Sequence, residues 1–219
     1  TNTFAGPLVV DGPGGLLRIE NQGALGSNSA PVIVSNGTLA ITGGYFISGV
    51  GGAVRTNLVT GSGSQWTNNG ALSFAGNAQV TLVATGTMVC AGGLTIGSQG
   101  PTPTRYGLAI TNGGRLVASG GVTIGSGKPS NTVFVTGGSG VTSYWANGAA
   151  TLVVGSVNGG STNLLVVDGA GVDGSAVLTN FNGITIGDNS GAHGNTVIIT
   201  NKGWVTALGG LLVGVNNSS

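Results

Sequence analysis

Residues that could perform acid–base or metal chemistry are few in this sequence and lie far apart. Its five carboxylates are Asp11, Glu20, Asp168, Asp173 and Asp188. Glycoside hydrolysis needs two carboxylates flanking one bond, and Ca²⁺ needs about six to eight oxygen ligands. The single histidine, His193, has no carboxylate or serine partner at a matching position and is expected at the surface. The sequence therefore predicts no enzyme activity, and no catalytic, metal-binding or cofactor-binding residue.

One glycine-rich loop matches a cofactor-binding pattern. Residues 169–174 read Gly-Ala-Gly-Val-Asp-Gly, which fits the dinucleotide-binding pattern G-x-G-x-x-G. The match carries little weight, because 46 of the 219 residues are Gly and residues 175–178 read as a strand where the motif requires a helix. Asp168 and Asp173 of this loop offer too few oxygens for Ca²⁺, and Asp is a common turn former. We therefore expect a turn here and no bound cofactor.

The three tryptophans are the candidate ligand-binding residues. Trp66, Trp145 and Trp204 fall at similar places, on or near the middle strand of a repeating unit. If they were exposed and aligned, their rings would stack on sugar rings and bind carbohydrate. Alternatively, each fills a corner or caps the interior of the fold, which the flanking Asn and Gly favour because these residue types form corners.

The composition excludes several classes of protein. Of the 219 residues, 46 are Gly, six are Lys or Arg and five are Asp or Glu. Gly costs about 1 kcal/mol at each interior helix position, which excludes a helical protein. Six scattered bases cannot neutralise a run of phosphates, so no nucleic-acid partner is expected. No apolar stretch approaches the roughly 20 residues of a membrane span. The lone cysteine, Cys90, excludes an intrachain disulfide and reads as a small buried residue.

A short apolar segment that ends in Gly recurs along the chain. Its copies are residues 94–97, 122–125, 152–155, 184–187 and 211–214. A second recurring strand-like segment occupies residues 108–111, 133–136, 165–168 and 197–200. A third apolar piece then follows, as at residues 115–118 and 204–207. Each unit therefore reads as three short strands separated by two tight corners and one variable loop. Such a unit buries its apolar residues only by stacking on its neighbours, which predicts an all-β parallel β-solenoid of about eight coils.

Alternation along each expected strand separates inward from outward residues. Leu94 and Ile96, and their counterparts in the other copies, are expected to stack as interior ladders. The outward column of the second recurring segment is unexpectedly apolar and contains Ala109, Phe134, Val166 and Ile198. Two explanations stay open for this column. Either a variable loop covers it, or it makes a lateral contact with another chain.

Two parts of the sequence resemble known bacterial repeats. Residues 58–214 resemble the repeat shared by autotransporter passengers and exosortase-sorted (PEP-CTERM) surface proteins. Residues 59–76, which read VTGSGSQWTNNGALSFAG, and the partial copy at residues 138–148 carry this similarity. Residues 2–44 are similar to the autotransporter-associated β-strand repeat, through the segments 2–6, 16–19, 23–27 and 36–39. The resemblance implies one right-handed parallel β-helix over residues 1–219, with residues 1–56 of the second type and 57–219 of the first, displayed outside the cell.

The leading functional hypothesis is an extracellular structural or adhesive solenoid of a bacterial cell surface or filament. The expected partners are other copies of the chain, joined end to end or laterally, and the chain is expected to be part of a longer protein. The alternative is a module that binds surface polysaccharide through the tryptophans. A minor alternative is an ice-binding face on the outward Thr column that includes Thr95 and Thr123, which Val153 and Leu212 interrupt. Insertion of this segment into a membrane is not expected.

Overall fold

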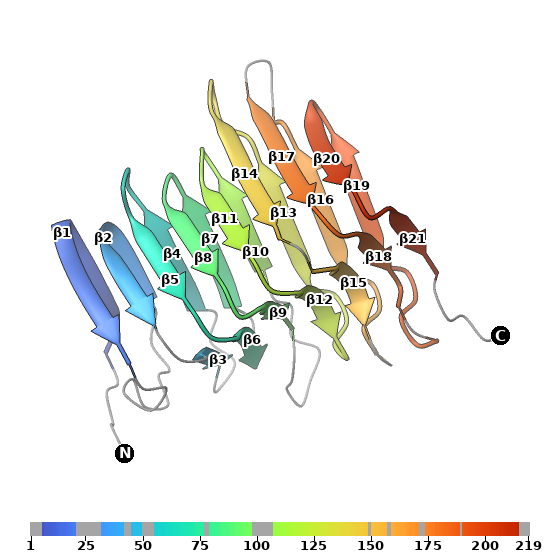
Figure 1. The fold of residues 1–219 in the computed structure, drawn as a ribbon, viewed down its shortest axis with the longest axis horizontal. Helices are drawn as coiled ribbons and strands as arrows, with labels where there is room; N and C mark the ends of the chain where they lie inside the picture. Colours follow the sequence, from blue (N-terminus) through green and yellow to red (C-terminus); the bar gives the residue numbers. More distant parts are fainter. Residues whose placement is uncertain are drawn as a thin grey trace.

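The computed structural model contains strands, turns and loops. It describes residues 6–20, 32–41, 45–49, 55–76, 79–97, 107–148, 150–156, 159–170, 174–188 and 190–214. Every named strand pairs in parallel with its neighbours, as the sequence predicts, and the strands follow one another along the long axis of the molecule (Figure 1). The all-β, largely parallel, solenoid-like architecture is therefore confirmed.

The larger sheet has two faces that meet at its first strands. The long strands β1 (Leu8–Ile19) and β2 (Val32–Ile41) contribute to both faces. The first face continues with β4 (Arg55–Thr60), β7 (Gln79–Ala84), β10 (Gly107–Thr111), β13 (Thr132–Thr136), β16 (Leu164–Asp168) and β19 (Thr196–Thr200). The second face continues with β5 (Gln65–Asn68), β8 (Thr87–Cys90), β11 (Arg115–Ala118), β14 (Thr142–Asn147), β17 (Ser175–Asn180) and β20 (Gly203–Ala207).

A smaller sheet forms the third face. Its strands are β3 (Tyr45–Gly49), β6 (Leu72–Gly76), β9 (Leu94–Ile96), β12 (Val122–Ser126), β15 (Leu152–Ser156), β18 (Ile184–Ile186) and β21 (Leu211–Val213). From β4 onward the chain visits the three faces in turn, so that each strand pairs with the corresponding strand of the preceding and following winding. The predicted unit of three strands is therefore present.

The core consists of aliphatic ladders that run through the stack of strands. Leu94, Ile96, Val122 and Ile124 are at most 1% exposed, and corresponding residues of the first face are equally buried. The predicted inward columns are confirmed. They loosen toward the C-terminal windings, where Ile186 is half-buried and Ile199 is 52% exposed, since β19 has no further strand beside it within the described part of the chain. Each fully buried Val, Leu or Ile contributes about 1.5–3 kcal/mol to stability.

The pattern Ser-x-Trp-x-Asn occurs on β5 and β14, where it joins two corners across the interior. Ser143 donates from Oγ to the carbonyl oxygen of Thr136 at 2.6 Å and accepts from the backbone N–H of Gly113 at 3.2 Å. Two residues further along β14, Trp145 is 0% exposed. Asn147, two residues further still, donates from Nδ2 to the carbonyl oxygen of Ala150 at 2.9 Å and closes the next corner.

The same arrangement recurs on β5. Ser64 donates to the carbonyl oxygen of Thr60 and accepts from the backbone N–H of Asn36 at 2.6 Å. Trp66 is 0% exposed, and Asn68 Nδ2 donates to the carbonyl oxygen of Gly70 at 2.6 Å. Successive inward positions of one strand therefore close a corner, fill the core and close a second corner.

A ladder of asparagines lines the corner that precedes the first face. Asn163 Oδ1 accepts from the backbone N–H of Asn131 at 3.0 Å and from its Nδ2 at 2.7 Å. Asn195 Oδ1 accepts the same pair of bonds from Asn163, both at 2.9 Å. Each side chain lies against a glycine of the preceding winding, as Asn163 lies against Gly125, whose φ is +77°. A side chain at such a glycine would collide with the ladder and would adopt an unfavourable φ.

Candidate functional site

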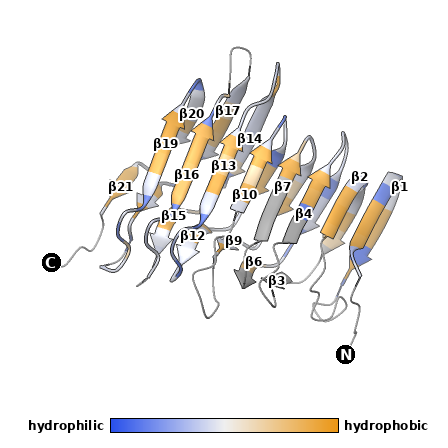
Figure 2. Ribbon diagram, turned by 180° about the vertical axis from the view of Figure 1, so that it is seen from behind, coloured by the Kyte–Doolittle hydropathy of each residue, from blue (hydrophilic) through white to orange (hydrophobic). Residues whose placement is uncertain are grey.

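The predicted outward column of the first face is part of a longer apolar row. Backbone pairing places one apolar residue of every strand at the same register position: Val9, Ile33, Leu58, Leu82, Ala109, Phe134, Val166 and Ile198. We call these residues the outer apolar column. Figure 2 views the molecule from the side on which these strands lie in front, and the hydrophobic colour runs along them.

The members of the outer apolar column whose side chains the structure describes are accessible to solvent. Phe134 is 40% exposed, Ile198 43% and Val9 53%, while Ala109 and Val166 are half-buried between their neighbours on adjacent strands. The explanation in which a loop covers the column therefore does not hold for the described residues. A lateral contact stays a prediction.

The residues beside the column are mostly uncharged. The next outward position is Thr in four strands of this face: Thr60, Thr111, Thr136 and Thr200. From β4 to β19, the strands of this face contain only two charged residues, Arg55 and Asp168. Asp168 Oδ1 accepts from the backbone N–H of Ala170 at 2.9 Å and from Asn201 Nδ2 at 3.1 Å. The face is a neutral, apolar strip with a Thr border.

The structure divides the three tryptophans between the core and the surface. Trp66 and Trp145 are 0% exposed, so the prediction that they stack on sugar rings is wrong and the alternative, interior placement, is confirmed. Trp204 is 66% exposed and lies one register position away from them, because it pairs with the outward Val177 whereas Trp145 pairs with the inward Leu178. A shift of one residue along a strand moves a side chain to the opposite face.

The outer surface of the second face brings a cation and aromatic rings together. Arg115, Tyr144, Val177 and Trp204 occupy one outward column on β11, β14, β17 and β20. The Arg115 guanidinium lies 5.3 Å from the centre of the Tyr144 ring, within range of a cation–π interaction. Trp204 Nε1 donates to Thr206 Oγ1 at 2.8 Å, which fixes the exposed indole. Sequence analysis missed this column, although the alignment of Asn112-Gly-Gly-Arg with Asn201-Lys-Gly-Trp contained the signal.

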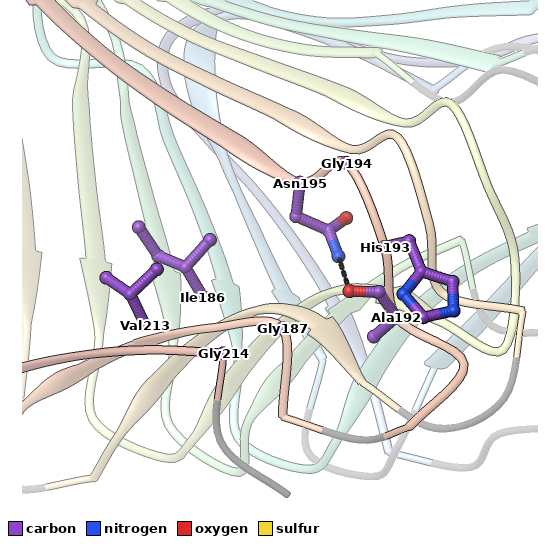
Figure 3. A pocket seen from close by; sticks show the side chains of 8 residues that line it. All are labelled: Ile186, Gly187, Ala192, His193, Gly194, Asn195, Val213 and Gly214. Atoms are coloured by element: carbon purple, nitrogen blue, oxygen red, sulfur yellow. Dashed lines mark hydrogen bonds between the residues drawn. The ribbon is translucent and has the colours of Figure 1, made fainter. Parts of the chain in front are cut away.

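A small cavity lies at the end of the asparagine ladder. It has a volume of about 190 Å³ and is lined by Ile186, Gly187, Ala192, His193, Gly194, Asn195, Val213 and Gly214 (Figure 3). Asn195 Nδ2 donates to the carbonyl oxygen of Ala192 at 2.8 Å, and the His193 side chain is exposed beside it. Gly187 occupies the position that Gly155 occupies one winding earlier. Gly155 is covered by Asn195, the last asparagine of the ladder. The cavity therefore continues the ladder and contains no acid–base pair among its lining residues.

The remaining candidate residues do not converge. Within the described ranges no group of three or more His, Cys, Asp or Glu residues could hold a metal ion. Asp168 lies in the described part, whereas Asp173 and residues 171–172 of the glycine-rich pattern lie outside it. In the column predicted for ice binding, Thr185 pairs with Val153 and Leu212 as predicted but is only 6% exposed, so it adds no accessible hydroxyl to a column that those two residues already interrupt.

Cys90 is buried, as the sequence predicts. It is 0% exposed on the inward side of β8, and loss of hydration on burial raises the pKa of its thiol to about 12. The described residues also include no helix long and apolar enough to cross a membrane. Comparison of the chain with protein-family models, with curated proteins and with solved structures finds no match in any of the three.

Proposed function

We propose that this chain is a structural or adhesive rod in an extracellular protein of a bacterial surface or filament. In this proposal the rod is a single right-handed β-helix of about eight coils. Its role is to hold an extended surface in place and to present the outer faces of the strands to partners.

One observation carries the proposal: parallel pairing between neighbouring windings runs the length of both sheets, with aliphatic ladders inside. Such an architecture depends on contacts between neighbouring windings and tolerates repetition, which suits a spacer or scaffold. The scarcity of charge and the resemblance of residues 58–214 to the repeat of autotransporter passengers and PEP-CTERM proteins support a location outside the cell.

Antibody labelling of the source bacterium tests the location. An antibody against the recombinant chain is applied to intact cells and to permeabilised cells. Surface display predicts equal labelling of both samples and loss of the signal when intact cells are treated with protease. Labelling that requires permeabilisation would contradict the proposal.

Binding to a surface polysaccharide is the second candidate function, and the exposed Trp204, which shares one outward column with Val177 and Tyr144, favours it. An indole held by a hydrogen bond to Thr206 offers an ordered apolar surface to a sugar ring. Co-sedimentation with insoluble polysaccharides tests this function, with Trp204→Ala as the variant and Leu208→Ala, at an equally exposed position, as the matched control. Binding that both variants retain, or no binding by the unaltered chain, would exclude this site.

A further inference from the structure

We propose that the outer apolar column is the interface of a two-fold symmetric dimer, in which two copies of this chain lie face to face with their long axes antiparallel. The two-fold axis lies between the two faces, runs along the strand direction and passes between β10 and β13. This inference rests on the proposed structural role, and it names the partner as a second copy of the chain.

A step in side-chain size marks the position of the axis. Ala109 and Phe134 are direct neighbours in the pairing of β10 with β13. Phe134 projects from the face and is 40% exposed, whereas Ala109 contributes only a methyl group beside it. A two-fold axis between them places Phe134 of each copy over Ala109 of the other. The large side chain then fills the depression next to its own counterpart, which is the self-complementarity that a two-fold interface requires.

The same axis matches the residues further out. It brings β16 opposite β7 of the second copy and β19 opposite β4. Ile198 then faces Leu58, and both are apolar. On the border of the column, Thr136 faces Thr111 and Thr200 faces Thr60. Apolar residues therefore meet apolar residues, and hydroxyls meet hydroxyls.

Side-chain size favours this arrangement over a parallel one. With the axis between β10 and β13, Asp168 faces Ala84 of the second copy, because β16 lies opposite β7. A two-fold axis along the rod would instead reverse the strand direction, place Phe134 against Phe134 and Ala109 against Ala109, and set Asp168 opposite Leu164. Two projecting phenylalanines would then meet beside two alanines, which lowers the shape complementarity of the interface. A partner protein that bound by charge complementarity would find almost no charge on this face.

The available area is sufficient for a modest dimer. The six strands from β4 to β19 span about 29 Å at roughly 4.8 Å per strand, and five residues of each strand span about 16 Å. Two such faces bury on the order of 1,000 Å² together, which is near the lower limit for a specific interface. We therefore expect a dissociation constant in the micromolar range.

Exchange of the two central residues tests the pairing. Sedimentation velocity over a concentration series is measured for the full chain, Phe134→Ala, Ala109→Phe and the double variant. The unaltered chain is expected to dimerise. Each single variant is expected to weaken dimerisation on the order of tenfold or more, because it places alanine against alanine or phenylalanine against phenylalanine. The double variant is expected to recover dimerisation, and an equimolar mixture of the two single variants is expected to form the heterodimer.

Controls separate association from folding and from cellular location. Far-UV circular dichroism checks that the variants fold, and Phe181→Ala, at a 56% exposed position outside the column, is expected to leave dimerisation unchanged. A monomeric unaltered chain, or single variants that neither the exchange nor the mixture rescues, would overturn the dimer. A surface-labelled but monomeric chain would overturn the dimer alone, whereas dimers of a chain found inside the cell would overturn only the proposed function.

Cross-linking tests the antiparallel orientation. Leu58→Cys and Ile198→Cys variants are mixed and treated with a bismaleimide that spans the roughly 10 Å between packed sheets. The native Cys90 is fully buried and is expected not to react. We expect products that join position 58 to position 198 of the other copy. Products that join 198 to 198, in the mixture or in the single variant, would overturn the antiparallel arrangement.

Discussion

Asn131 gives two hydrogen bonds to one oxygen atom of Asn163, one from its backbone at 3.0 Å and one from its side chain at 2.7 Å. The two residues are 32 positions apart in the sequence, and both are buried. Since Asn163 repeats this pattern with Asn195, one residue type fixes the spacing of three successive windings at a corner where the loops differ in sequence.

Removal of the middle rung of this ladder is expected to destabilise the chain. Asn163→Ala leaves the backbone N–H of Asn131 without its acceptor, whereas Asn131 Nδ2 keeps its bond to the carbonyl oxygen of Lys128 at 2.9 Å. A buried unsatisfied group costs about 1–3 kcal/mol. Chemical denaturation should show a loss of roughly 1–3 kcal/mol. Asn182→Ala is the control, because Asn182 is exposed and its side chain makes one long bond of 3.4 Å to Thr151. Equal effects of the two variants would contradict a structural role for the ladder.

Replacement of Gly125, which lies against the asparagine ladder, is expected to destabilise the chain for two separable reasons. Gly125→Ala combines a φ of +77° with a collision between the new methyl group and the Asn163 side chain. Gly63→Ala has a similar φ of +88° but meets nothing within 4 Å. We expect a cost of about 1 kcal/mol for Gly63→Ala and at least twice that for Gly125→Ala. Denaturation midpoints measure both, and a Gly125 variant as stable as the Gly63 variant would show that the ladder yields to the methyl group.

The buried and exposed tryptophans are expected to respond differently to truncation. Trp145→Ala opens a large cavity in the core and should cost about 3–5 kcal/mol. Trp204→Ala removes an exposed side chain and should cost under about 0.5 kcal/mol. Trp145→Phe should be milder than Trp145→Ala because it leaves a smaller cavity, while both remove an indole N–H that is buried without a partner. Thermal denaturation ranks the variants, and a larger cost at Trp204 would contradict the assigned register.

Stability is expected to fall at high pH because of Cys90. Burial raises the pKa of the folded thiol from 9.0 to about 12, so the unfolded state loses its proton first. The contribution is therefore fully present below pH 9 and is lost progressively as the pH rises toward 12. Within this window the folding equilibrium falls up to about tenfold for each pH unit. Cys90→Ala should flatten this dependence of stability on pH. The core accommodates alanine at the paired position of the next winding, Ala118. An unchanged pH profile would contradict the assignment to Cys90.

The sequence predicts the repeated elements of this fold well, because their side chains alternate with a fixed period. The segments at 94–97 and 122–125 become strands, with the predicted inward residues buried. The sequence places Trp204 at a position similar to those of Trp66 and Trp145, but its side chain lies on the opposite face of the strand. A large apolar residue fits either face, and only the pairing with Val177 decides between them.

The candidate interface was only partly predictable. Four residues of the outer apolar column follow from alternation, but the row extends to Val9, Ile33 and Leu58 only through backbone register between windings of unequal length. The asparagine ladder was visible as a regular spacing of 32 residues from Asn131 to Asn163 and on to Asn195. Its role was not predictable, because it depends on a contact between windings rather than on a local pattern.

The direction of the strands also determines how the rod would respond to tension. The strands run across the long axis, so the hydrogen bonds between windings point along it (Figure 1). A force applied to the two ends would therefore break a few bonds at a time, and windings would peel off one after another. Each released winding of about 30 residues adds roughly 100 Å of extended chain. Under load the rod would extend in steps, one winding at a time, and would become several-fold longer before its last winding opened.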